Sequence, residues 1–452
     1  MNIIIAGYGK VGSLLTRQLC AEGHNITVID SDDAVLQPSE DRYDIMTYSG
    51  NCASRSTLKA AGIENADLLI AATNADEVNL LCCATAISLN PKLKTIGRIR
   101  NPDYAEQVHH MSDIFGLSMV FNPEKQAAAE IERLLKYPVS LRRDTLAKGE
   151  TEIVELPVDA GSKLCNVKLM DLRKLVKCQV LVCAVIRDGS AVAPKGDFVL
   201  QEGDRIFVTA LSENLTTLLR NLGMLTRRVR SVTICGGGRT SYYLAHELNN
   251  AGISTRIIEK NPARINELHT LLPESDIFDY DISEPEFWEN EKQTKTDALI
   301  TLTGKDELNM ITSLYAISQG IPKVITKLRS KDGNSIIGSL NLGSLICPRE
   351  LACSDIVRYI RAIGNKTGEA ISVHTIADGQ AEAMEFIADA HTHNCGKPLK
   401  EIRLKPNVLL VSISHGANTE IANGSSVFRQ GDTVVVVTNG REMIRQFNDI
   451  FA

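Results

Sequence analysis

Apolar runs of strand length alternate with stretches of helical periodicity along the first 140 residues. The chain opens on an apolar run at Asn2–Ala6, and the next strands are predicted near Ile26–Ile29 and Asp44–Tyr48. Short apolar runs between helical stretches are typical of the buried strands of a parallel, doubly wound α/β sheet. Further strands are expected at Asp67–Ala72, Thr95–Arg98 and Met119–Phe121, and helices after Lys10, over Ser54–Ala61, from Asp76 to about Leu89 and from Pro123 toward Lys136.

The same pattern returns in the second half of the chain. Ser231–Cys235 corresponds to Asn2–Ala6 at a shift of about 229 residues, and Lys327–Arg329 corresponds to Arg98–Arg100 at the same shift. A helix is expected over Leu351–Ile363, at the place of the last helix of the first copy. Internal similarity at this spacing indicates a tandem duplication of one structural unit.

Two smaller segments with a different pattern follow the two copies. Their short apolar runs are separated by turn residues at Gly203-Asp204 and Gly431-Asp432, which indicates a small α+β fold. The strands expected are Val180–Arg187, Phe198–Leu200 and Arg205–Ala210 in the first segment and Val408–Ser414, Val427 and Thr433–Val437 in the second. The predicted domains are therefore two Rossmann-like sheets at 1–140 and 229–366, each followed by a small α+β domain, at 141–228 and 367–452.

Composition adds that the chain should form several ordinary globular cores. Its 452 residues exceed the size of one hydrophobic core, and 44% hydrophobic with 23% charged residues argues against extensive disorder. The net charge of −6 argues against a large nucleic-acid surface. The 11 cysteines include no Cys-x-x-Cys pair, and no apolar run resembles a membrane span or a secretory signal. We therefore expect a cytoplasmic protein with reduced thiols.

The loop after the first strand, Gly7–Gly12, has the G-x-G-x-x-G spacing of a dinucleotide-binding turn. Gly7 permits the tight turn, Gly9 lets backbone N–H groups approach a pyrophosphate, and Gly12 lets the following helix pack closely. Asp30 ends the next strand, where its carboxylate would bind ribose hydroxyls and repel a 2′-phosphate, so NAD(H) is favoured over NADP(H). A βαβ fold that keeps these glycines without a ligand is the alternative.

The second copy carries a changed loop. Gly236 and Gly238 are kept and Glu259 takes the place of the ribose-binding aspartate, but Ser241 replaces the third glycine. Tyr280 stands where the first copy has a glycine after its third strand. Serine is small enough for the fold but is expected to loosen the packing of helix on strand. A working pocket and a degenerate, empty or differently selective one both remain open.

Two further loops lie at the same edge of the first predicted sheet. Asn51 follows the third strand, near the expected adenine end of the ligand, and Thr73-Asn74 follows the fourth strand. The carboxyl ends of parallel strands meet at one edge, so these side chains are candidates for nucleotide contacts. The alternative for Thr73-Asn74 is simple capping of the helix that begins near Asp76.

No catalytic constellation accompanies these loops in the sequence. His391-x-His393-x-Cys395 has metal-binding residue types but no fourth ligand, and Cys82-Cys83 follows a helical pattern typical of a core. We find no nucleophile elbow, Ser/His/Asp order or paired catalytic carboxylates. The sequence therefore favours a nucleotide sensor that is not an enzyme. An NAD-dependent dehydrogenase and a nucleotide-independent scaffold are the alternatives.

Together these motifs resemble the TrkA family, the peripheral subunits of Trk potassium-uptake systems, which are built from tandem RCK domains. The resemblance rests on Ala6–Gly12, Asn74–Asn79 and Arg98–Arg100 and on their second-half counterparts, such as Asp306–Asn309. It covers essentially the whole chain and implies the order RCK-N, TrkA-C, RCK-N, TrkA-C. The departures at Ser241 and Tyr280 put the second nucleotide site in doubt.

The resemblance also implies a cytoplasmic regulator on the inner face of the cell membrane. Four chains would form a homotetrameric ring of eight RCK domains, held by crossover helices from Pro123 and Pro348, and NAD(H), or ATP or ADP, would gate potassium flux through a membrane-embedded Trk subunit. The activating ligand, the membrane subunit and any effector of the TrkA-C domains stay open. The nucleotide-binding residues predicted are Gly7, Tyr8, Gly9, Lys10, Val11, Gly12, Asp30, Asn51, Thr73, Asn74 and Arg98, and Gly236, Gly237, Gly238, Arg239, Thr240 and Glu259. No catalytic residue and no metal site is predicted.

Overall fold

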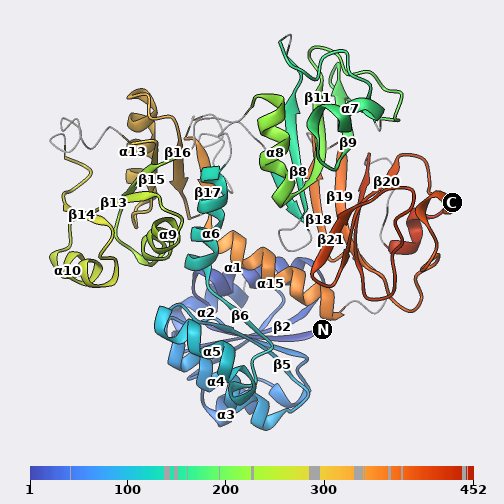
Figure 1. Cartoon of the computed structure of the whole chain (residues 1–452). Helices are drawn as coiled ribbons and strands as arrows, with labels where there is room; N and C mark the ends of the chain where they lie inside the picture. The colour runs from blue at the N-terminus through green and yellow to red at the C-terminus, as the bar shows by residue number, and fades with distance from the viewer. Residues whose placement is uncertain are drawn as a thin grey trace. The chain divides into compact units, whose positions relative to one another are not determined.

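The chain forms two compact units. Figure 1 labels their helices and strands. The first unit joins Met1–Val139 with Arg228–Val357, and the second joins Ser140–Arg227 with Arg358–Ala452. Each unit thus combines one segment from each half of the duplicated sequence. The computed structural model describes all residues except 41, 137–142, 147–150, 160, 193, 225–228, 285–295, 330–339, 341, 365–367, 378–379, 440–443 and 445.

The first copy in the first unit is a 6-stranded parallel sheet in the order β3-β2-β1-β4-β5-β6. β1 lies at the reversal of strand order, with Ile3 opposite both Ile26 of β2 and Leu68 of β4. Such a reversal is the switch point at which α/β folds bind ligands. The elements are β1 Asn2–Ala6, α1 Lys10–Ala21, β2 Asn25–Asp30, α2 Asp33–Glu40, β3 Met46–Ser49, α3 Arg55–Ala60, η1 Ile63–Asn65, β4 Leu68–Ala71, α4 Asp76–Leu89, β5 Lys94–Arg98, α5 Pro102–Phe115, β6 Met119–Phe121 and α6 Pro123–Lys136.

The second copy repeats this sheet in the order β14-β13-β12-β15-β16-β17. Ile234 of the central strand β12 is paired with Ile257 of β13 and Ile300 of β15, and all three side chains are buried. The predicted duplication and α/β class are confirmed. The elements are β12 Ser231–Cys235, α9 Arg239–Asn250, β13 Ser254–Glu259, α10 Pro262–Leu271, β14 Asp276–Asp279, β15 Ala298–Thr301, α13 Asp306–Ser318, β16 Val324–Lys327, β17 Ser344–Ile346 and α15 Pro348–Gly364.

Helix α6 follows the last strand of the first sheet but packs on the second copy. Its residues Ala127 and Ile131 share one buried core with Val232 of β12. At its C-terminal end, the Nζ of the buried Lys323 donates to the carbonyl oxygen of Leu135 at 2.8 Å. A lysine at this position satisfies carbonyl groups that a helix C-terminus leaves unpaired. Helix α6 therefore crosses from the first copy to the second within one chain, as expected for a crossover helix.

Helix α15 makes the return contact with the first copy. The Sγ of Cys353 lies 4.0 Å from the carbonyl oxygen of Val11 in α1. The two crossing helices also touch, because Gln126 of α6 donates to Asp355 of α15 at 2.6 Å. Among the described helices of the chain, none is long and apolar enough to cross a membrane.

The second unit contains two 5-stranded antiparallel sheets, in the orders β10-β9-β11-β8-β7 and β18-β19-β22-β20-β21. One buried cluster takes Ile153 and Phe207 from the first sheet and Ala383 and Val435 from the second. The elements are β7 Arg143–Leu146, β8 Thr151–Pro157, α7 Leu169–Val176, β9 Val180–Arg187, β10 Ser190–Val192, β11 Arg205–Leu211, α8 Ser212–Leu222, β18 Ser372–Ile376, β19 Ala381–Ile387, η4 Leu399–Glu401, β20 Val408–His415, β21 Asn418–Ile421, β22 Thr433–Thr438 and η5 Phe447–Ile450.

Two predicted strands of this unit are wrong, Phe198–Leu200 and Val427. Val199 forms only an isolated bridge with Lys168, because the N–H of Phe198 turns back to the carbonyl of Lys195 at 3.0 Å. Val427 follows a turn and belongs to no strand. These apolar residues lie in loops. A short apolar run in the sequence looks the same whether its residues lie in a packed loop or in a strand of the sheet.

The two small domains differ in one equivalent pair of hydrogen-bonded side chains. At the end of β9, Arg187 binds Asp204 through two hydrogen bonds of 2.8 and 2.7 Å, and its guanidinium lies 4.5 Å from the ring centre of Phe198. At the end of β20, His415 binds Asp432 through Nδ1 at 2.8 Å. Hydrogen bonding from Arg187 lowers the pKa of Asp204 and outweighs the opposing effect of burial.

This pair generates a pH-dependent prediction. A carboxyl group whose pKa is lowered by folding stabilises the protein above its unfolded-state pKa, and this stabilisation is lost as pH falls through the folded value. Arg187→Gln should lower the free energy of unfolding by about 1–3 kcal/mol at neutral pH, because it leaves the buried Asp204 underpaired. The difference from wild type should shrink below pH of about 4 in urea unfolding curves.

The control for this prediction is Lys174→Gln, which breaks the exposed ion pair with Asp171. Exposed pairs contribute little, so this variant should unfold like wild type. Equal unfolding midpoints of the Arg187 variant and wild type at neutral pH would contradict the prediction.

Candidate functional site

The glycine-rich loop of the first copy joins β1 to α1 at the switch point of the sheet. Gly7 has φ of +99°, and a Cβ there would lie 2.9 Å from the backbone nitrogen of Thr73. A Cβ on Gly12 would lie 1.9 Å from the carbonyl oxygen of Gly7. Gly9, in contrast, faces open space, and no side chain caps the N-terminus of α1. The loop therefore needs its first and third glycines to close and leaves the helix N-terminus open to an anion.

Asp30, the last residue of β2, lies against this loop. Its Oδ2 accepts a hydrogen bond from the backbone N–H of Tyr8 at 2.6 Å, and its Oδ1 accepts one from the N–H of Asp32 at 3.0 Å. Lys10 and Val11 begin the helix just beyond, the lysine exposed and the valine buried. The structure therefore brings the predicted ribose-binding carboxylate and the predicted phosphate-binding loop together.

Thr73 is held by a buried asparagine from the next helix. Both the N–H and the hydroxyl of Thr73 donate to Asn79 Oδ1, at 2.9 and 2.7 Å, and Asn79 Nδ2 donates to the carbonyl of Arg98 at 2.9 Å. The N-cap of α4 is Ala75, and no side chain caps this helix. Simple capping by Thr73-Asn74 is therefore not what the structure shows. Asn79 instead joins the ends of β4 and β5.

Sequence reasoning did not single out Asn79 as part of the site. Its signal was present, because Thr303 and Asn309 repeat the spacing in the second copy and make the same hydrogen bonds, at 3.0 and 2.6 Å. Asn309 also donates to the carbonyl of Lys327, which corresponds to that of Arg98. A polar residue buried at the same place in both copies serves a shared structural purpose.

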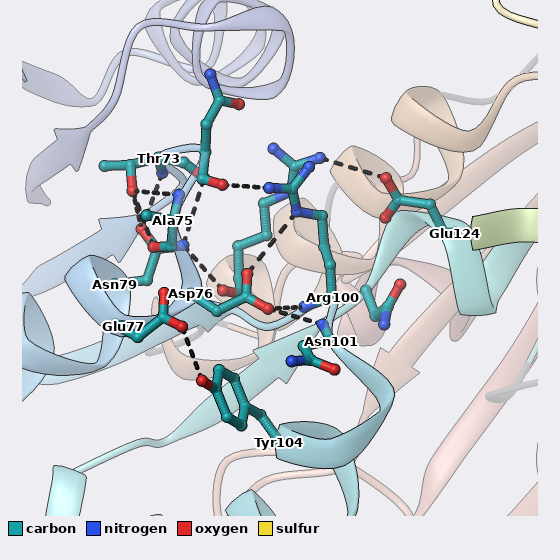
Figure 2. Close-up of polar contacts among 12 residues, drawn as sticks. Thr73, Ala75, Asp76, Glu77, Asn79, Arg100, Asn101, Tyr104 and Glu124 are labelled. Atoms are coloured by element: carbon teal, nitrogen blue, oxygen red, sulfur yellow. Dashed lines mark hydrogen bonds and ion pairs between the residues drawn. The ribbon is translucent and has the colours of Figure 1, made fainter. Parts of the chain in front are cut away.

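Charged groups line the edge of the sheet next to Thr73 (Figure 2). Arg98, at the end of β5, has a largely buried side chain, and its Nη2 lies 3.7 Å from Glu124 Oε1. Burial lowers the pKa of Arg98, and the attraction of Glu124 opposes this. Arg98 Nε and Glu124 Oε2 are buried without a hydrogen-bond partner in the described part of the chain. Such a cation has capacity to bind an anionic group.

The neighbouring residue Arg100 ties this edge to α4. Its side chain donates to the carbonyl of Asn74, an exposed predicted residue, and its N–H donates to Asp76 Oδ2 at 2.8 Å. Figure 2 also shows Asp76 accepting from the N–H of Asn101, at 2.7 Å. Asn51, after β3, uses its side-chain oxygen locally, accepting from the N–H of Ala53 at 2.9 Å. Among the described residues, no hydrogen bond joins the Asn51 side chain to the other predicted residues.

The second loop shares with the first a positive-φ first glycine and a bond to an acidic residue, but its surroundings differ. The N–H of Gly237 donates to Glu259 Oε2 at 2.7 Å, as Tyr8 does to Asp30. The hydroxyl of Ser241 donates to the carbonyl of Gly236, so serine at the third glycine position is buried and bonded and does not leave the loop loose.

Two side chains of α10 close in on this second loop. Arg264 Nε donates to the carbonyl of Gly237 at 2.6 Å, where the first copy has Val35. A Cβ on Gly237 would lie 2.7 Å from Leu268 Cδ1, so this glycine leaves room for the leucine. Gly238 faces open space, and Arg239 and Thr240 begin α9 beyond it. The second loop therefore also leaves the N-terminus of its helix uncapped, and it carries an additional cation, Arg264.

Parallel sheets with glycine-rich switch-point loops, each facing an acidic residue on the adjacent strand, make this a protein of the Rossmann-like nucleotide-binding class. Residues 3–123 and 232–348 match the family described as TrkA-N domain, and residues 153–223 and 383–452 match the TrkA-C domain. The chain belongs to the family of proteins built from these two domains in tandem. This confirms the resemblance drawn from its motifs.

Relatives of full length are found in bacteria and archaea. The chain is 27% identical to "Trk system potassium uptake protein TrkA" of Vibrio alginolyticus, over 100% of this chain and 98% of the relative. It is 28% identical to the TrkA homolog of Archaeoglobus fulgidus over 100% of both. Among solved structures, the GsuK RCK domain has a TM-score of 0.61 at 15% identity, covering 97% of this chain and 92% of that one. The GsuK channel bound to NAD has the same TM-score at 16% identity, covering 97% and 76%.

The role of Asn79 gives a stability prediction. Asn79→Leu keeps the volume but leaves the Thr73 N–H and the Arg98 carbonyl unpaired. The free energy of unfolding should fall by about 2–4 kcal/mol in denaturant titrations. Asn309→Leu should have a similar effect in the second copy, whereas Asn418→Leu, at an exposed strand position, should change little. Stability of the Asn79 variant equal to wild type would contradict the role assigned here.

Proposed function

We propose that this chain is the nucleotide-binding regulatory subunit of a Trk-type potassium-uptake system. Its family and its full-length similarity to proteins named for Trk potassium uptake support this assignment. A chain with two nucleotide-binding folds and two small domains leaves no part for a dedicated catalytic domain. The protein is thus proposed to sense a nucleotide and to act on a membrane partner, and not to be an enzyme.

The observation that carries the proposal is the pair of charged groups flanking the first loop. In the sheet order β2-β1-β4-β5, Asp30 ends the strand on one side of the loop and Arg98 ends a strand on the other. A ribose on the carboxylate and phosphates at the open N-terminus of α1 would direct the remaining anionic charge toward Arg98. Its unpaired Nε would then gain a partner.

The ligand class proposed is NAD(H) or an adenine nucleotide. Asp30 would repel a 2′-phosphate, which disfavours NADP(H). Among proteins of similar fold, GsuK has been solved bound to NAD and, with a TM-score of 0.51 at 11% identity, bound to ADP. Both ligands share the adenosine that Asp30 would hold, so phosphates or nicotinamide beyond it would distinguish them. A ligand that favours one arrangement of the domains would shift the protein toward it.

Binding tests this proposal directly. Asp30→Asn removes the charge that accepts from ribose hydroxyls, so affinity for NADH and ADP should fall about tenfold or more, as expected for a charge-assisted hydrogen bond. Calorimetry on the full chain measures both ligands. The control is Asp33→Asn, which removes the charge of an exposed aspartate in α2. This variant should bind both ligands like wild type.

The outcomes separate the alternatives. Equal affinity of wild type and Asp30→Asn would contradict the proposed pocket. Absence of binding by any nucleotide would favour a scaffold, and substrate-dependent oxidation of NADH would favour a dehydrogenase. Two sites per chain, one of them lost in Glu259→Gln, would assign a function to the second loop.

We also propose that the chain assembles into a homotetrameric ring at its membrane partner. Leu81 of α4 and Ile311 of α13 are 57% and 66% exposed at corresponding positions of the two copies. Exposed apolar residues at matching sites are typical of repeated subunit contacts.

The double variant Leu81→Asp and Ile311→Asp should lower the molar mass measured by light scattering, whereas Leu271→Asp, exposed at the end of α10, should not. An unchanged mass in the double variant would contradict this interface.

A further inference from the structure

A tyrosine of the second copy reaches the edge of the first nucleotide pocket. Tyr243 lies on α9, one turn after Arg239, and its side chain is buried. Its hydroxyl donates to the carbonyl oxygen of Arg100 at 2.9 Å and accepts from Asn122 Nδ2 at 3.1 Å. Burial raises the pKa of Tyr243 to about 12, so the hydroxyl keeps its proton and remains a donor.

The carbonyl that Tyr243 binds belongs to a peptide group held from both sides. The Arg100 carbonyl and the Asn101 N–H are parts of one planar peptide. Tyr243 binds that carbonyl, whereas Asp76 accepts from that N–H at 2.7 Å. A shift of Tyr243 therefore acts on the orientation of this peptide, and through it on Asp76 at the start of α4.

The same peptide adjoins residues proposed to contact the first nucleotide. The Arg100 side chain binds the carbonyl of Asn74, and Arg98 precedes it by two residues. The charge of Arg239 contributes to lowering the pKa of Arg98, so the beginning of α9 lies near this edge as well. Residues at the start of α9 and residues at the edge of the first loop are therefore close enough for binding at one loop to affect the other.

Helix α9 is suited to carry this movement. It begins directly after Gly238, so phosphates at the second loop would contact its N-terminus. Its buried face packs with α6 in one core, including Leu244 and Leu248. A packed helix moves as a rigid element, because close-packed interiors do not deform continuously.

The positions equivalent to these two hydrogen-bonding residues carry other residue types. The position of Tyr243 is taken in α1 by Leu14, and Cys347 stands before α15 where Asn122 stands before α6. The Sγ of Cys353 in α15 lies 4.0 Å from the carbonyl oxygen of Val11 in α1, a distance at which a thiol hydrogen bond is weak. Tyr243 and Asn122 thus have no residue of the same type at the equivalent positions of the other copy.

We propose that Tyr243 couples the two nucleotide pockets of one chain, so that occupancy of the second loop reorganises the Asn74–Arg100 edge of the first. This inference rests on the proposed nucleotide binding and adds that the second loop acts as a modulator of the first. Tyr243 is a positioning residue, because it acts through the Arg100–Asn101 peptide. Its effect on the first pocket should be a several-fold change in affinity, within the range of known coupling energies.

Amide hydrogen exchange on the full chain tests the coupling. In Asp30→Ala, the first pocket is disabled, so NADH or ADP can bind only at the second loop. Nucleotide should then slow exchange at 236–240 and also, by about threefold or more, at 98–102 in the first copy. Adding Tyr243→Phe should abolish the protection at 98–102 while that at 236–240 persists. Tyr359→Phe, the same chemical change in α15, should leave both signals intact.

Each result decides between the proposals. Protection at 98–102 that survives Tyr243→Phe would overturn the coupling. So would protection at 236–240 without protection at 98–102. Both results would leave nucleotide binding itself intact. In wild type, protection at 7–12 without any at 236–240 would also overturn it, because the second loop then binds nothing. Protection at neither loop would reject nucleotide binding itself. Should Tyr243→Phe fail to fold, Asn122→Ser keeps a helix-capping residue, loses the bond to Tyr243 and should weaken the signal at 98–102.

Discussion

The packing of α6 onto the second copy is the contact on which the rest of the first unit depends. Ala127 and Ile131 complete a core whose strands belong to the other half of the sequence, and Lys323 from that half pairs with the end of the helix. Because each copy supplies part of the other's core or helix contacts, the two nucleotide-binding folds form one unit. The residues around Arg98 and Arg100, at the edge of the first sheet, therefore lie next to α9 of the second copy. In a separate domain, this edge would be exposed to solvent.

Duplication has kept the backbone of the pocket and changed its chemistry. Both loops have a positive-φ first glycine and an acidic residue bound to a loop N–H. The second loop adds Arg264 and fills the third glycine position with Ser241, whose hydroxyl binds within the loop. The two loops of one chain therefore share a fold but present different side chains to a ligand.

The sequence predicted the sheets well, because buried parallel strands and glycine spacing leave local signals. Cys82 and Cys83 are buried in the core as their helical pattern indicated. The hydrogen-bonding role of Asn79, the contact of Tyr243 with Arg100 and the closure by Arg264 were missed, since each depends on residues brought together by folding. The strand predicted at Phe198–Leu200 failed for the same reason, because a loop packed under Arg187 looks locally like a strand.

Potassium flux through the assembled system tests the central claim, that nucleotide at the first loop regulates a membrane partner. The chain and its membrane subunit would be reconstituted in vesicles, and flux measured with and without NADH or ADP. We predict that a nucleotide changes flux with wild type and with Asp33→Ala but not with Asp30→Ala. An identical nucleotide response of wild type and Asp30→Ala would contradict the claim.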